Sequence, residues 1–101
     1  MPADPVAGLA AELSGLAGAE VELERPGNPQ HGDYATNVAL RLARAERRPP
    51  RELAEELAGR AGSLPAVERA EVAGPGFVNL WLSDGWYAAA LEAILAVGEA
   101  P

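Results

Sequence analysis

The first part of the chain changes from a helical to a strand-like pattern of apolar positions. A helix is predicted to begin at Asp4-Pro5, because a carboxylate can cap free N–H groups and proline suits the first helical position. Its apolar stripe has helical spacing and consists of Val6, Leu9, Ala10, Leu13, Leu16 and Ala17. Gly18 is placed to end this helix. Val21 and Leu23 then alternate with glutamates, which predicts a short half-buried strand.

Prolines and glycines divide the middle of the chain. Residues 25–33 read Arg-Pro-Gly-Asn-Pro-Gln-His-Gly-Asp, which predicts an ordered turn or loop. A second helix is predicted from near Tyr34–Thr36 to about Arg47, with an inward face formed by Val38, Ala39, Leu42 and Ala43. Pro49-Pro50 ends one helix and opens the next, so a third helix is predicted over Arg51–Ala61.

The last part of the chain predicts a hairpin followed by a helix. Val67–Val72 and Phe77–Leu82 are the strand candidates, and Gly74-Pro75-Gly76 supplies a tight turn between them. Ser83 is placed to cap a final helix that ends near Gly98. The apolar residues of this helix are Tyr87, Leu91, Ile94 and Leu95. This order predicts a single α+β domain over residues 1–101, with a small antiparallel sheet and about four helices packed mainly on one face.

Composition removes several classes of function. The chain has no cysteine, one histidine and no apolar run near the length of a membrane span, and its first residues lack the character of a signal peptide. These features indicate a cytoplasmic protein. His31 has no sequence context for a catalytic triad or a metal site, so we expect no catalytic residue, metal or cofactor in this chain. His31 is interpreted instead as a loop residue that holds a turn.

The strand Phe77–Leu82 has the pattern most typical of a binding surface. Every second residue from Val78 onward is aliphatic and belongs against the helices, which puts Phe77, Asn79 and Trp81 on the opposite face. An aromatic ring can stack on an unpaired base, and an amide can both donate and accept at the edge of a base. The alternative is that this face is covered by the first helix or by the rest of a larger protein. The alternation leaves both interpretations open.

A run of arginines is the second candidate for an RNA contact. All eight basic residues are arginine, and five of them occur close together at Arg41, Arg44, Arg47, Arg48 and Arg51. Because the net charge is −7, any contact with phosphates must be local and assisted from outside the chain. Arg44 and Arg48 share a helical face and are expected to hold a phosphate backbone. The alternative is a solvated face in which the arginines pair with Glu46, Glu52 and Glu55.

Three blocks of the sequence resemble a known family. They are His31–Ala39 (His-Gly-Asp-Tyr-Ala-Thr-Asn-Val-Ala), Pro50–Ala54 (Pro-Arg-Glu-Leu-Ala) and Val72–Leu80 (Val-Ala-Gly-Pro-Gly-Phe-Val-Asn-Leu). Their order and spacing, across about residues 4–98, are similar to those of the N-terminal domain of arginyl-tRNA synthetase. The resemblance implies an appendage of a class I synthetase that contacts the D-loop corner of tRNA(Arg).

The same resemblance implies roles for individual residues and for a parent enzyme. Phe77 and Asn79 are expected to lie against a D-loop base, whereas Trp81 departs from the family pattern, in which a basic or smaller polar residue is common. The chain lacks HIGH-like and KMSKS-like sequences, so we do not expect it to charge tRNA by itself. The implied parent joins arginine to tRNA with ATP and magnesium, and its catalytic and anticodon-binding domains are the expected partners, with no membrane and no DNA.

A different class of function also fits these residues. A free-standing protein-interaction module of the same fold would use Phe77 and Trp81 as apolar anchors and would have no RNA role. Binding to RNA is expected to weaken steeply with salt, and apolar docking is not.

Overall fold

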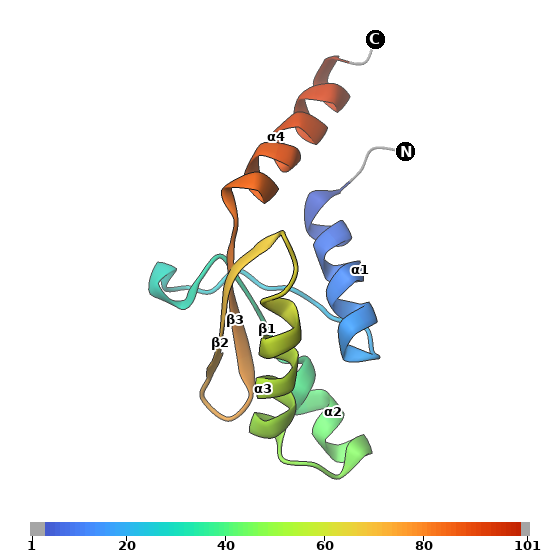
Figure 1. Ribbon diagram of the computed structural model, residues 1–101, viewed down its shortest axis with the longest axis vertical. Helices are drawn as coiled ribbons and strands as arrows, with labels where there is room; N and C mark the ends of the chain where they lie inside the picture. The colour runs from blue at the N-terminus through green and yellow to red at the C-terminus, as the bar shows by residue number, and fades with distance from the viewer. Residues whose placement is uncertain (1–3, 100–101) are drawn as a thin grey trace.

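The computed structural model describes residues 4–99 and shows a three-stranded sheet with helices against one face (Figure 1). The helices are α1 (Pro5–Ala17), α2 (Val38–Glu46), α3 (Pro50–Ala61) and α4 (Asp84–Glu99), with a short 3-10 helix η1 (Pro29–His31). The strands are β1 (Tyr34–Thr36), β2 (Val67–Ala73) and β3 (Phe77–Leu82). The sheet order is β1-β3-β2 with both pairs antiparallel, so the predicted α+β class and the predicted hairpin are confirmed.

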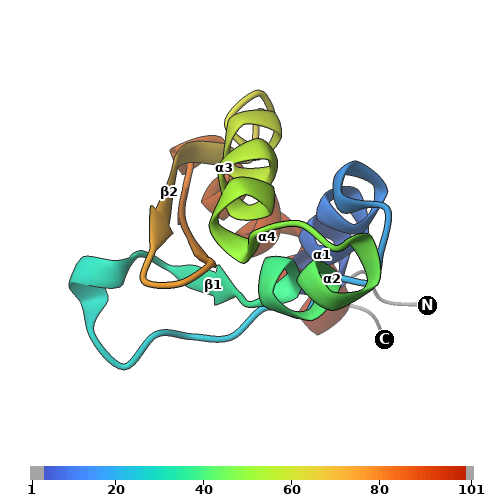
Figure 2. The same ribbon diagram turned by 90° about the horizontal axis from the view of Figure 1, so that it is seen from below.

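The inner face of the sheet packs against α2 and α3, and α1 packs against α3. Figure 2 shows these helices on one side of the strands and the loop 25–33 on the other. Alternate residues of β3 are buried beneath the helices, as the alternation predicted, and they are Val78, Leu80 and Leu82. Leucines and small residues of the helices complete the core, notably Leu9, Leu13, Val38, Ala54 and Leu57. Removal of these apolar side chains from water is the main contribution to the stability of the domain.

The predicted helix ends carry the expected caps. The Asp4 carboxylate accepts hydrogen bonds from the N–H groups of Val6 and Ala7, at 3.0 and 3.2 Å. Gly18 ends α1 in the left-handed conformation, with φ of 74°. The Ser83 hydroxyl accepts from the Trp86 N–H at 3.1 Å, which confirms it as the cap of α4.

Two predictions about local structure are wrong. Tyr34–Thr36 is a strand and α2 begins only at Val38, because this segment pairs with β3 and the Thr36 hydroxyl then accepts the Val38 N–H at 3.2 Å. The segment around Val21 and Leu23 has no regular secondary structure, and its only bridge is Glu24 with Ala35, so it forms no strand within the described residues. Val21 is still buried, which is the origin of its alternating pattern.

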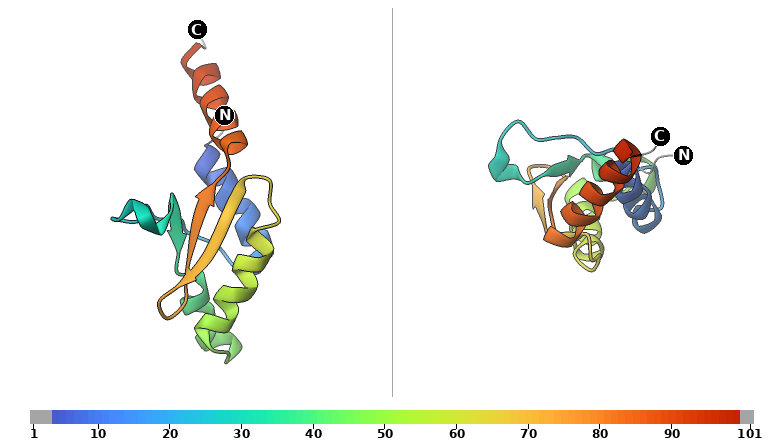
Figure 3. Two further views of the ribbon diagram at one scale, coloured as in Figure 1. Left: turned by 60° about the vertical axis from the view of Figure 1, so that its left-hand side comes forward. Right: turned by 90° about the horizontal axis from the view of Figure 1, so that it is seen from above.

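Helix α4 extends away from the sheet beyond α1 and makes the molecule elongated, with principal extents of 51 × 27 × 24 Å (Figure 3). It reaches Glu99, slightly past the predicted end, and the side chain of Ile94, predicted to lie on its apolar face, is outside those that the structure describes. None of the helices within residues 4–99 is both long enough and apolar enough to cross a membrane.

Candidate nucleic-acid interface

The pairing of the strands sets one row of side chains across the outer face of the sheet. Ala35 of β1 pairs with Asn79 of β3, which pairs in turn with Glu71 of β2. Glu24 bridges to Ala35 and extends the row beyond the edge of the sheet. Because Ala35 has a single methyl group, the surface between Glu24 and Asn79 is hollow.

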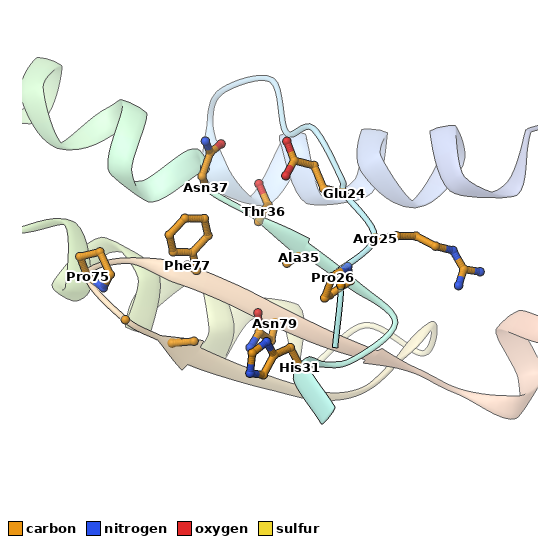
Figure 4. A pocket seen from close by; sticks show the side chains of 13 residues that line it. Glu24, Arg25, Pro26, His31, Ala35, Thr36, Asn37, Pro75, Phe77 and Asn79 are labelled. Carbon is orange, nitrogen blue, oxygen red and sulfur yellow. The ribbon is translucent and has the colours of Figure 1, made fainter. Parts of the chain in front are cut away.

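This hollow is a pocket of about 440 Å³, open to solvent, that lies between the outer face and two loops (Figure 4). One wall comes from the segment before β1, and the other comes from the turn between β2 and β3. Its lining residues are Glu24, Arg25, Pro26, Gly27, His31, Ala35, Thr36, Asn37, Ala73, Gly74, Pro75, Phe77 and Asn79. Two of the residues predicted to contact RNA, Phe77 and Asn79, therefore lie in one concave site.

Phe77 and Asn79 present complementary chemistry to this pocket. The Phe77 side chain is 38% exposed although it is a large apolar group. Figure 4 shows its ring and the Asn79 amide at successive outward positions along β3, with His31 on the rim of the same pocket. A ring beside an amide can hold a flat heteroaromatic group by stacking and by edge hydrogen bonds.

The amide of Asn79 is nearly buried yet chemically available. The residue is only 8% exposed. None of the side-chain hydrogen bonds found within residues 4–99 involves it. No fully buried polar side-chain atom of the described residues lacks a partner, so the Asn79 amide atoms must reach the pocket. A nearly buried amide with no protein partner favours a ligand that hydrogen-bonds to it from within the pocket.

The wall of the pocket is fixed to β3 by two consecutive residues, Gly32 and Asp33. Gly32 has φ of 96°, and a Cβ built there would lie 2.6 Å from the carbonyl oxygen of Leu80. The Asp33 N–H donates to that same oxygen at 2.8 Å, and the Asp33 carboxylate accepts the Leu82 N–H at 2.8 Å. Gly32 and Asp33 therefore join the loop to β3.

Asp33 also connects the loop to α4. Partial desolvation and the nearby Asp33 carboxylate raise the pKa of Tyr87 to about 12.

Replacement of Asp33 by alanine is expected to lower the free energy of unfolding by about 1–3 kcal/mol, because the Leu82 N–H loses its acceptor. Urea unfolding of the two proteins measures this difference. Glu68→Ala is the matched control, since it removes an exposed carboxylate from β2 and is expected to change stability by less than about 0.5 kcal/mol. Equal effects of the two substitutions would show that the Asp33 contact contributes nothing.

Comparison with known proteins identifies the family. The sequence model of one protein family, described as the arginyl tRNA synthetase N terminal domain, matches residues 6–82. The chain belongs to this family. The arginine–tRNA ligase of Geobacillus kaustophilus is 43% identical over 96 residues, which cover 90% of this chain and 17% of the ligase. That of Paracoccus denitrificans is 47% identical over 85 residues, which cover 84% of this chain and 15% of the ligase.

A solved structure agrees with this assignment. The arginyl-tRNA synthetase of Thermus thermophilus matches with a TM-score of 0.57 and 27% identity, over 93% of this chain and 15% of that protein. The chain thus spans less than a fifth of the length of the relatives that it matches. Among the residues described in this synthetase N-terminal domain, no three His, Cys, Asp or Glu side chains are grouped as metal ligands would be.

Trp81 shares the outer face of the synthetase N-terminal domain with Phe77 and Asn79 but lies outside the pocket. It is half-buried, and the guanidinium of Arg69, on the neighbouring strand, lies 4.7 Å from its ring centroid. Arg69 is also ion-paired with Glu71. One face of the indole is therefore already stacked, and a contact between Trp81 and RNA stays a prediction.

Three arginines of the predicted cluster have partners within the domain. Arg48 is ion-paired with both Glu52 and Glu56, and these bonds raise its pKa. Arg51 pairs with Glu55 at 3.7 Å, and it also donates to the carbonyl of Gly74 at 2.7 Å. Arg41 donates to the carbonyl of Glu20 at 2.7 Å.

Arg44 is exposed on α2, and neither Arg44 nor Arg48 lines the pocket. The arginine that does line it is Arg25, which was not among the candidates. A role for Arg44 and Arg48 in holding RNA stays a prediction.

Proposed function

We propose that this domain recognises the D-loop corner of tRNA(Arg) by taking one base into the pocket formed by Phe77, Asn79 and Ala35. The parent synthetase would then attach arginine to that tRNA in its catalytic domain, with ATP and magnesium. The observation that supports this proposal best is the exposed Phe77 ring beside an amide that has no protein partner among the described residues.

The shape of the pocket suits a splayed-out base. The Phe77 ring would stack on one face of the base, and such stacking contributes about 1–3 kcal/mol. Asn79 would donate and accept at the base edge, since its amide offers both kinds of group. Ala35 leaves room at the centre of the row, and a larger side chain there would fill the site.

The charges around the pocket favour a base over a phosphate. Its charged lining residues are Glu24 and Arg25, one of each sign, and the whole chain carries −7. A site that recognises a base depends mainly on hydrogen bonds and stacking, whereas a site that binds phosphates depends on the release of counterions from the RNA. We therefore infer that most phosphate contacts of tRNA(Arg) are made by other domains of the synthetase.

Replacement of Asn79 by alanine in a synthetase that carries this domain is expected to lower kcat/KM for tRNA(Arg). The loss should correspond to about 1–3 kcal/mol, the size of one good base contact. Steady-state aminoacylation at varied tRNA concentration measures it, with thermal unfolding to confirm that the variant is folded.

The matched control for this variant is Gln30→Ala. It removes an exposed amide from η1 that does not line the pocket, so kcat/KM for tRNA should stay within about 0.5 kcal/mol of the parent value. An Asn79→Ala enzyme with unchanged kcat/KM for tRNA would remove Asn79 from the recognition site.

A further inference from the structure

Three exposed apolar side chains form a stripe along α4. Within the part of the chain that the structure describes, the exposed large hydrophobic residues are Phe77, Tyr87, Leu91 and Leu95. Phe77 belongs to the pocket described above. The other three recur every fourth residue, which places them along one side of α4, and they are 43%, 56% and 52% exposed.

An apolar groove of about 520 Å³ continues this stripe toward α1. It lies between the first turn of α1 and the first half of α4. Apolar and aromatic side chains from α1, β1 and α4 line it, among them Val6, Tyr34, Trp86, Ala90 and Leu91. The rings of Trp86 and Tyr87 pack edge to face with centroids 5.1 Å apart, so the aromatic wall of the groove is ordered.

The fold itself does not cover this surface. Figures 1 and 3 show α4 leaving the sheet and extending past the beginning of α1, with no other element of residues 4–99 beside its outer half. An exposed apolar stripe that is continuous with an apolar groove is typical of a surface that another protein segment covers.

We propose that the α4 stripe, defined as Tyr87, Leu91 and Leu95, and the adjoining groove dock against the catalytic body of an arginyl-tRNA synthetase. The relatives of this chain are arginine–tRNA ligases of which it spans only 15–17%, so the family carries a much larger body in the same polypeptide. This inference rests on the family and not on the contact with RNA.

The charges of α4 indicate what the docked surface is like. The charged residues of its sequence are Asp84, Glu92 and Glu99, and it has no arginine. A second copy of this chain would set one acidic helix against another, in a protein whose net charge is already −7. The complementary partner is an apolar surface with a basic rim, and we assign it to the synthetase body.

Hydrogen exchange tests this docking directly. The free chain would be compared with the same chain joined to the body of the Geobacillus kaustophilus arginine–tRNA ligase, in place of that enzyme's own N-terminal residues. Amides over residues 88–95 are expected to exchange on the order of tenfold more slowly in the joined protein, because docking suppresses local opening of α4. Equal exchange rates in the two proteins would overturn the proposal.

Two substitutions on α4 separate docking from a general effect of the fusion. Leu91→Glu puts a charge in the centre of the stripe and is expected to abolish the added protection. Ala89→Glu puts the same charge at an exposed position on another side of the same helix and is expected to preserve it. Both free variants should retain the helical circular dichroism of the parent chain, since both sites are exposed. Loss of protection in both variants would contradict docking on the synthetase body. The proposal would also be contradicted if α4 were protected in a dimer of the free chain but not in the joined protein.

Discussion

Replacement of Gly32 by alanine is expected to destabilise the domain by about 3 kcal/mol or more, the largest effect that we predict for a single added methyl group. Gly32 has φ of 96°, which side chains rarely tolerate, and the new Cβ would lie 2.6 Å from the Leu80 carbonyl oxygen. That oxygen belongs to the backbone of β3 and already accepts the Asp33 N–H, so it cannot move without loss of this bond.

Denaturant unfolding of Gly32→Ala beside Gly27→Ala measures this effect. Gly27 lies in the same loop and also lines the pocket, but a Cβ built there meets nothing within 4 Å and its φ needs no glycine. We expect Gly27→Ala to be neutral or slightly stabilising, because it restricts the unfolded chain. If both variants unfold at the same denaturant concentration, the close approach of the loop to β3 does not require glycine at position 32.

Joint replacement of Phe77 and Asn79 by alanine is expected to lower kcat/KM for tRNA(Arg) by about 3 kcal/mol, a little over a hundredfold. The two side chains offer different interactions to the same base, namely stacking and an edge hydrogen bond, so removal of both leaves the pocket with neither. Their effects need not add, because they lie close together on β3 and share one ligand.

The kinetic parameters for the other substrates are the control for this double variant. At saturating tRNA, the apparent KM values for arginine and ATP should match those of the parent enzyme, since no catalytic group is altered. A variant that loses activity toward arginine and tRNA alike has a folding defect or a displaced domain, and that result would argue against recognition by the pocket.

The helices were predictable because their signals are local. Asp4-Pro5, Gly18, Pro50 and Ser83 set helix ends through groups within a few residues of one another. Strand β1 was mistaken for the beginning of a helix because Tyr34–Thr36 is only three residues long. Its pairing partner, β3, lies far along the chain, and no local pattern reveals such a partner. The aromatic and β-branched residues at its two ends were the available signal.

Only the part of the candidate site that lies on β3 was predictable from the sequence. Alternation along β3 placed Phe77 and Asn79 on one face without knowledge of the fold. The floor at Ala35 and the wall at His31 depend on the missed strand and on the loop before it, so sequence patterns did not connect them to Asn79. The arginines were grouped by their closeness in sequence, whereas the turn after α2 directs Arg48 toward glutamates of α3.

The entry of a D-loop base into the pocket is tested most directly by removing bases from the tRNA. Aminoacylation kinetics would compare the parent enzyme and the Phe77→Ala, Asn79→Ala double variant on tRNA(Arg) transcripts in which each D-loop base in turn is absent. At one position, removal of the base is expected to lower kcat/KM of the parent enzyme about a hundredfold. The same removal should leave the already reduced kcat/KM of the double variant almost unchanged. A variant whose deficit is the same on every transcript would contradict recognition of a base by Phe77 and Asn79.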